Sequence, residues 1–167
     1  DVDGDGDPDL VVNYEDSGAA LLINQGDGKF AAPITVPTGA YPNALMLADI
    51  DNDADLDMVA VNFSADDVSV NLNDGSGGFS DASFYDAFGD SSFGGVVADV
   101  DGDGFLDILT VTKGLTHGSM FRNLGDGTFG EPLAFGDGFE NLGDVVAADI
   151  DNDGDADLLL MGSEGLF

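Results

Sequence analysis

Four copies of one acidic pattern, Asp-x-Asp-x-Asp-x-x-x-Asp, recur along this chain of 167 residues. The copies begin at Asp1, Asp49, Asp99 and Asp149, so successive copies lie 48, 50 and 50 residues apart. A fixed period near 50 residues is typical of a repeat protein, in which each unit is one supersecondary structure that packs against its neighbours. The chain is therefore expected to fold as a series of similar small units.

The acidic pattern itself predicts a cation site in each unit. Carboxylates at alternate positions of a tight loop point inward together and repel one another unless a cation lies among them. Ca²⁺ is the expected ion, because it accepts oxygen ligands without the strict octahedral geometry of Mg²⁺. Softer metals call for His or Cys, and the chain has one His and no Cys. Solvated acidic turns are the alternative interpretation, but four copies in phase favour metal loops.

Ligand positions follow by analogy with the EF-hand loop, in which positions 1, 3 and 5 give side-chain oxygens and position 7 gives its carbonyl. Position 12, a Glu in the EF-hand, falls here in an apolar run, so position 9 is expected to supply the last carboxylate. Up to four calcium ions are predicted. Their ligands are Asp1, Asp3, Asp5, Asp7 and Asp9; Asp49, Asp51, Asp53, Asp55 and Asp57; Asp99, Asp101, Asp103, Phe105 and Asp107; and Asp149, Asp151, Asp153, Asp155 and Asp157.

Position 6 of the loop predicts differences among the sites. Gly6, Gly104 and Gly154 occupy it in three copies, as expected where a sharp turn needs a positive φ. The second copy has Ala54, and a left-handed Ala costs on the order of 1 kcal/mol, so this site is expected to be the weakest. The third and fourth sites are expected to be the best formed, since Asp1 of the first can fray.

Between the acidic loops, a complete unit shows four short apolar or alternating segments without a helical period. An Asn-x-Gly-x-Gly-x-Phe motif joins the third segment to the outer one and predicts a β-hairpin. The predicted strands are 44–48, 96–98 and 145–148 (first); 10–12, 58–61, 108–111 and 158–161 (second); 20–23, 68–72 and 119–122 (third); and 34–36, 83–85 and 133–135 (outer). The hairpins are 24–30, 73–79 and 123–129.

These loops and hairpins resemble the FG-GAP and VCBS repeats, whose units form β-propeller blades, as in the integrin α-chain head. The resemblance rests on the Asp loops preceded by Ala-Asp (48–49, 98–99, 148–149) and on the Asn hairpins, and covers essentially the whole chain. It implies an all-β fold of β-propeller-type four-stranded antiparallel blades, with calcium bound between the first and second strands by Asp49, Asp51, Asp53, Asp57 and their equivalents.

The period gives about three and a third repeats, and hence a partial propeller or blade array. A single repeat domain, 1–167, is predicted, with units at approximately 1–38 (without its first strand), 39–88, 89–138 and 139–167 (ending after its second strand). Such propellers usually carry about seven blades, so the chain, which begins on the predicted ligand Asp1, is expected to be a fragment or processed product, or to be completed by neighbouring copies.

Charge limits the partners. The formal net charge of −31 excludes nucleic acid and disfavours anionic membranes, and no apolar run is long enough to insert in a bilayer. Loops of this kind fill where calcium is millimolar, so an extracellular location, secreted or at the cell surface, is expected. The sequon Asn62-Phe63-Ser64 is compatible with an N-glycan at Asn62.

The predicted function is a calcium-stabilised extracellular binding, adhesion or structural module. A protein or glycan ligand is expected on the loops 13–19, 63–67 and 113–118, which differ between units. The alternatives are a subunit of a head-to-tail filament, whose partner is a copy of itself, and part of a secreted enzyme acting on polysaccharide or lipid. Catalysis is not expected, because no third member accompanies His117 and Ser119.

Overall fold

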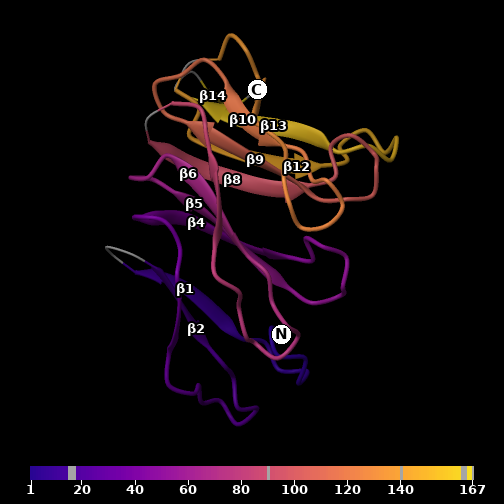
Figure 1. Ribbon diagram of the computed structural model, residues 1–167. Coiled ribbons are helices and arrows are strands. Elements are labelled where there is room, and N and C mark those ends of the chain that lie inside the picture. The colour runs from indigo at the N-terminus through magenta and orange to yellow at the C-terminus, as the bar shows by residue number, and fades with distance from the viewer. Residues whose placement is uncertain (15–17, 90, 140, 163–164, 167) are drawn as a thin grey trace.

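The computed structural model describes residues 1–14, 18–89, 91–139, 141–162 and 165–166. Within these ranges the chain forms four antiparallel sheets and no helix (Figure 1). The two middle sheets have four strands each, paired in chain order. The alternating and β-branched segments therefore fold as strands, and the predicted all-β fold of four-stranded, propeller-type blades is confirmed.

The strands of the first two sheets are β1 (Leu10–Tyr14), β2 (Gly18–Leu22) and β3 (Ile34–Val36), followed by β4 (Pro42–Ala48), β5 (Asp57–Asn62), β6 (Asp67–Asn71) and β7 (Ser83–Asp86). Those of the last two are β8 (Ser92–Ala98), β9 (Asp107–Thr112), β10 (Gly118–Phe121) and β11 (Leu133–Phe135), followed by β12 (Asp144–Ala148), β13 (Asp157–Gly162) and β14 (Gly165–Leu166).

The two end sheets were predicted to be incomplete. The first has three strands and begins with the equivalent of β5, as predicted. The prediction that the last unit ends after its second strand is wrong, because the short strand β14 pairs with β13 through Met161 and Leu166. The pattern of period two could not reveal a strand of two residues.

Each Asn-x-Gly-x-Gly-x-Phe motif forms the predicted hairpin. Its Asn and Phe face each other across an isolated bridge in all three copies, as in Asn73 and Phe79. Both glycines of that copy, Gly75 and Gly77, have positive φ values of 76° and 77°, which only glycine adopts without strain. These hairpins place the Asn beside the acidic loops.

The hydrophobic core lies between successive sheets. Val68 and Val70 of β6 pack with Ile108 and Phe121 of the next sheet, and similar clusters join the first sheet to the second and the third to the fourth. Burying such a side chain contributes roughly 1.5–3 kcal/mol. Contacts between blades therefore supply much of the stability.

The end sheets expose apolar side chains that the middle sheets bury. Every residue of β5 and β9 is buried, whereas Leu10 and Val12 of β1 are 47% and 42% exposed and Met161 of β13 is 51% exposed. Self-association through these segments stays a prediction. The described part of the chain contains no helix that is both long and apolar enough to cross a membrane.

Candidate metal centres

The four acidic loops lie at one end of the sheets. Three of them connect the first and second strands of a sheet, and the first precedes β1. In Figure 1 all four extend toward the right of the view, beside the hairpins. The in-phase spacing of the sequence thus brings equivalent carboxylates to equivalent places on successive blades.

Within each loop, the side-chain carboxylates accept hydrogen bonds from nearby backbone N–H groups. In the second loop Asp49 accepts a hydrogen bond from Ala54 N (3.1 Å), Asp51 from Asp53 N (3.3 Å) and Asp53 from Asp55 N (3.0 Å). The same three bonds recur in the other loops. Because the carboxylates at positions 1, 3 and 5 each accept a hydrogen bond from a backbone N–H further along the loop, these side chains turn into the loop.

Three carboxylates approach one another closely in every loop, with one oxygen from each residue within 4.8 Å of the others. This donor set consists of hard oxygens, which fit calcium, and the clusters could bind metal ions. The sets are Asp1, Asp3 and Asp5; Asp49, Asp51 and Asp53; Asp99, Asp101 and Asp107; and Asp149, Asp151 and Asp157.

The position-9 aspartates join each loop to its blade. Asp57 is fully buried, and its two oxygens accept hydrogen bonds from Ile50 N and Asn73 N, both at 2.8 Å. Asp107 is also fully buried and binds Val100 N and Asn123 N. Position 9 approaches the other carboxylates in the third and fourth loops, but its role as a ligand in all four stays a prediction, as does the carbonyl of position 7.

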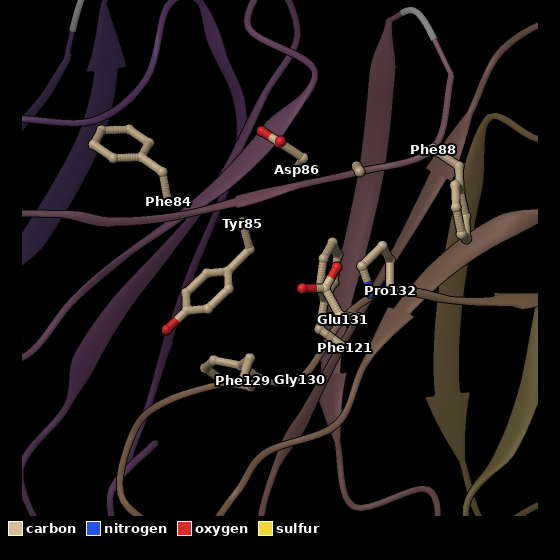
Figure 2. A pocket seen from close by; sticks show the side chains of 10 residues that line it. Phe84, Tyr85, Asp86, Phe88, Phe121, Phe129, Gly130, Glu131 and Pro132 are labelled. Carbon is tan, nitrogen blue, oxygen red and sulfur yellow. The ribbon is translucent and has the colours of Figure 1, made fainter.

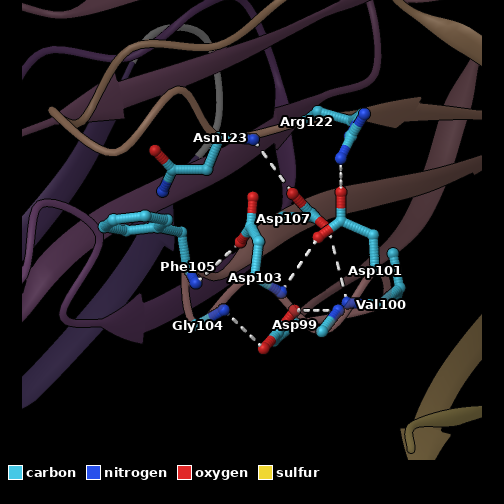
Figure 3. A network of polar contacts seen from close by, with 10 residues as sticks. Asp99, Val100, Asp101, Asp103, Gly104, Phe105, Asp107, Arg122 and Asn123 are labelled. Atoms are coloured by element: carbon cyan, nitrogen blue, oxygen red, sulfur yellow. Dashed lines mark hydrogen bonds and ion pairs between the residues drawn. The ribbon is translucent and has the colours of Figure 1, made fainter.

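The third loop differs from the others because a positively charged side chain contacts one of its carboxylates. Figure 3 shows Arg122, at the end of β10, pointing its guanidinium at the carboxylate of Asp101, with which it forms an ion pair. Leu72 stands at the equivalent place before Asn73 in the second unit. The expectation that the third site is among the best formed did not take this neighbour into account.

Backbone conformation follows the prediction at position 6 and adds a second constrained position. Gly6, Gly104 and Gly154 have φ values of 94°, 90° and 100°, and Ala54 has a φ of 78°. Position 4 is also left-handed, and it is always Gly or Asn, the residues that tolerate this conformation best. Its φ values are 72° at Gly4, 62° at Asn52, 75° at Gly102 and 63° at Asn152.

Replacing Ala54 by Gly is therefore expected to stabilise the protein by about 0.5–1 kcal/mol. The gain is the relieved left-handed strain of about 1–2 kcal/mol, less the greater conformational entropy that Gly adds to the unfolded chain. Urea unfolding measures it. Gly104→Ala is the matched reverse change, because an added Cβ would meet nothing within 4 Å, and it should destabilise by a similar amount. A stabilising effect of Gly104→Ala would contradict the argument.

Acid should stabilise the metal-free protein. Burial raises the pKa of Asp57 and of Asp107, against the lowering effect of their backbone hydrogen bonds. The native state then binds protons more readily than the unfolded state. This contribution to the free energy of unfolding is fully present below the ordinary carboxyl pKa and is lost as the pH rises through the raised, folded-state pKa.

Thermal unfolding of calcium-depleted protein should therefore show a midpoint that rises as the pH is lowered from about 7 to about 4. Saturating calcium should reverse this direction, because protons then compete with the metal for the same carboxylates. A metal-free midpoint that falls with acid would contradict the pKa shifts.

A pocket lies between the second and third sheets, away from the metal loops' carboxylates. Its cavity volume is about 430 Å³. Figure 2 shows Tyr85 projecting from β7 toward Phe129 and Glu131, whereas Phe84 and Asp86 project from the opposite face of the strand. The Tyr85 and Phe129 rings pack edge to face with centroids 5.4 Å apart, whereas Phe84 is 54% exposed. The pocket thus combines the aromatic surface of Tyr85 and Phe129 with the carboxylate of Glu131.

Two of the three loops predicted to bind a ligand line a second pocket, at the opposite end of the strands from the metal loops. It measures about 320 Å³, and its lining includes Asn13, Tyr14 and Phe63 from two of those loops, together with Tyr41 and Asn43. The first pocket was not anticipated, because its lining comes from residues 84–88 of one blade and from Phe121 and residues 129–132 of the next, which only the packing of the blades brings together.

His117 lies in a setting that explains it without catalysis. Its ring packs edge to face on Phe88 with centroids 5.5 Å apart, and its Nδ1 lies 3.8 Å from an Asp137 carboxylate. Ser119 is fully buried, and its hydroxyl accepts a hydrogen bond from Phe88 N. The two side chains therefore serve separate packing contacts.

The predicted N-glycan at Asn62 is not compatible with the fold. Asn62 is fully buried, and its side-chain nitrogen donates hydrogen bonds to Asp67 Oδ1 (2.7 Å) and Ser69 Oγ (3.1 Å). A glycan requires this nitrogen at the surface. Asn62 is the buried last residue of β5, and this prediction was wrong.

Side-by-side antiparallel blades with acidic loops at one end define a β-propeller-type repeat protein. A family model described as FG-GAP-like repeat matches residues 1–60, 49–110 and 112–160. The chain belongs to the FG-GAP-like repeat family, which confirms the resemblance seen in its sequence. Among proteins with curated descriptions, none matches the chain.

Two solved structures show the same fold. The chain is similar to an Agrocybe aegerita lectin that recognises non-reducing terminal N-acetylglucosamine, with a TM-score of 0.70, 28% identity, and coverage of 99% of this chain and 46% of the lectin. It is also similar to part of the Photorhabdus luminescens Tc holotoxin pore, with a TM-score of 0.54, 24% identity, and coverage of 95% and 8%. The chain thus spans less than half the length of either.

Proposed function

We propose that this chain is a calcium-stabilised extracellular binding module built of propeller-type blades, and that it has no catalytic role. The observation that carries the proposal is the convergence of three carboxylates in each of four equivalent loops. In a chain of net charge −31, such clusters are unfavourable without cations. Four calcium ions would reduce that charge to −23 and tie each loop to its blade.

The side chains at positions 1, 3, 5 and 9 of each loop and the carbonyl at position 7 would hold the ion. When bound, calcium would supply positive charge that offsets the repulsion among these carboxylates. The residues contribute the loop shape through their hydrogen bonds to backbone N–H groups. Binding free energy thereby adds to folding free energy, and millimolar extracellular calcium suits this role.

The ligand we propose is a glycan in the pocket between the second and third sheets. The similarity to a lectin that recognises N-acetylglucosamine supports a glycan as the ligand. The residues that line this pocket support it as the binding site. The ring and hydroxyl of Tyr85 offer a sugar an apolar surface and a hydrogen-bonding group, and the carboxylate of Glu131 can accept hydrogen bonds from its hydroxyls.

Calorimetric titration with an oligosaccharide ending in N-acetylglucosamine tests this assignment. Glu131→Gln is expected to weaken binding about tenfold or more, through the loss of a charge-assisted hydrogen bond, and Tyr85→Phe about threefold to tenfold, through the loss of the hydroxyl. Leu124→Ala is the matched control, because Leu124 is 65% exposed and lies outside the pocket lining. Equal affinity in all three variants would show that the glycan does not bind in this pocket. Absence of binding to the wild-type protein would reject this glycan as the ligand.

A further inference from the structure

The side chains of Asn73 and Asn123 connect one blade to the acidic loop of the blade before it. Asn73 Nδ2 donates to the carbonyl of Val2 at 2.8 Å, and Asn123 Nδ2 donates to the carbonyl of Ile50 at 2.8 Å. These partners are 71 and 73 residues apart in the chain. Both Asn residues are more than nine-tenths buried, so the bonds lie away from competing water.

The remaining hydrogen-bonding groups of Asn73 hold it within its own blade. Its backbone N–H donates to Asp57 Oδ1 (2.8 Å), its Nδ2 also donates to Leu56 O (3.1 Å), and its Oδ1 accepts from Gly75 N (3.2 Å). Asn123 makes the equivalent set of bonds. Both amide protons are used, so neither Asn can move without breaking a bond.

The bonds form one continuous path through three acidic loops. Asp9 binds Val2 N, and the carbonyl of Val2 binds Asn73. Asn73 binds Asp57, which also binds Ile50 N. The path then repeats in the same order through the carbonyl of Ile50, Asn123, Asp107 and Val100 N.

The residue at position 2 of the acidic loop is buried where a hairpin Asn of the next blade binds its carbonyl, and exposed in the fourth loop. Val2 and Ile50, whose carbonyls receive an Asn from the following blade, are 2% and 0% exposed. Ile150 occupies the same loop position in the fourth unit and is 56% exposed. The covered peptides are thus fixed from both sides, by a carboxylate of their own loop and by the next hairpin.

We propose that Asn73 and Asn123 couple the cation sites of the first three blades, so that ordering of one acidic loop raises the cation affinity of its neighbours. The inference rests on the proposed function, because it assumes that the loops bind calcium. Ordering a loop fixes its position-2 peptide, which holds the next hairpin Asn and, through it, the position-9 carboxylate of the next site. The fourth loop lies outside the path and binds independently.

Calcium titration of metal-free protein by calorimetry tests the coupling, with Asn24→Ala as the matched control. Asn24 makes the equivalent bonds within its own blade, to Pro8 O, Asp9 and Gly26 N, and none of its hydrogen bonds in the described chain reaches another loop. Asn73→Ala and Asn123→Ala should each weaken calcium binding about fivefold or more beyond Asn24→Ala and lower the Hill coefficient, and the double variant should bring it close to 1. Equal effects of the three substitutions would overturn the coupling, whereas wild-type protein that binds no calcium would overturn the proposed function.

Hydrogen exchange gives a second test that does not remove an Asn. Asp51→Asn weakens the second site and leaves every Asn side chain in place. In calcium, the coupling predicts faster exchange not only in the second loop but also in the first and third, while the fourth loop exchanges as in wild type. Faster exchange confined to the second loop would overturn the proposal.

Discussion

Removal of calcium is expected to lower the midpoint of thermal unfolding by roughly 20–40 °C. A site that binds calcium at about a hundred times its dissociation constant adds about 2.7 kcal/mol to the free energy of unfolding, and the four clusters together would add about four times as much. In a domain of this size each kcal/mol shifts the midpoint by about 2–4 °C. Circular dichroism in millimolar calcium and in excess chelator measures the difference.

Two controls separate a specific site from general charge screening. Sodium chloride at high ionic strength screens the same net charge of −31 without binding in the loops. It should therefore reverse only a small part of the decrease in the midpoint temperature. Magnesium should restore less than calcium, because the loops supply flexible carboxylates and not a strict octahedron. Identical melts with calcium and with chelator would leave the loops as acidic turns and reject the calcium assignment.

Asp57→Ala is expected to cost about 2–5 kcal/mol even without calcium. The substitution leaves Ile50 N and Asn73 N without their acceptor in a buried site, and each unsatisfied donor costs about 1–3 kcal/mol. Part of this loss is offset because the substitution also removes a buried carboxylate. The burial of that carboxylate is unfavourable, as the raised pKa of Asp57 indicates. Urea unfolding of the metal-free protein measures the structural share, and the same experiment in calcium adds the share of the lost ligand.

Asp157→Ala is the matched control for this change. Asp157 occupies the same loop position, but it is only half-buried and accepts its bond from Ile150 N (2.9 Å), whose residue is 56% exposed. Water can replace that bond, so the metal-free protein should lose less than about 1 kcal/mol. Equal losses in the two variants would mean that burial by neighbouring blades does not determine the role of position 9.

The strands and hairpins could be predicted because their signals are local. Alternation with period two, the Gly pair after each Asn and the aspartates at fixed spacing all act within a dozen residues. The strands β5 and β9 thus begin at Asp57 and Asp107, the position-9 residues. Position 4 could also have been found, since Gly or Asn in every copy is itself a local signal for a positive φ.

What the sequence did not reveal depends on contacts between strands or between blades. The approach of Arg122 to Asp101, the burial of Asn62 and the pocket beside Tyr85 arise where strands or blades meet. Asn73 is the clearest case: its motif predicts a turn, yet its side chain reaches back across 71 residues to Val2. No spacing within one unit specifies which carbonyl that amide meets.

The bond from each hairpin Asn to the preceding loop also bears on how such a chain can change length. Both junctions use the same donor and the same acceptor position, so the second unit presents its Asn73 donor to the first unit and the carbonyl of Ile50 to the third. Duplicating or excising a whole unit of about 50 residues at equivalent points would recreate a junction of the same kind. A cut at any other interval would leave an amide facing the wrong carbonyl, so this architecture tolerates growth and shortening only in whole-unit steps.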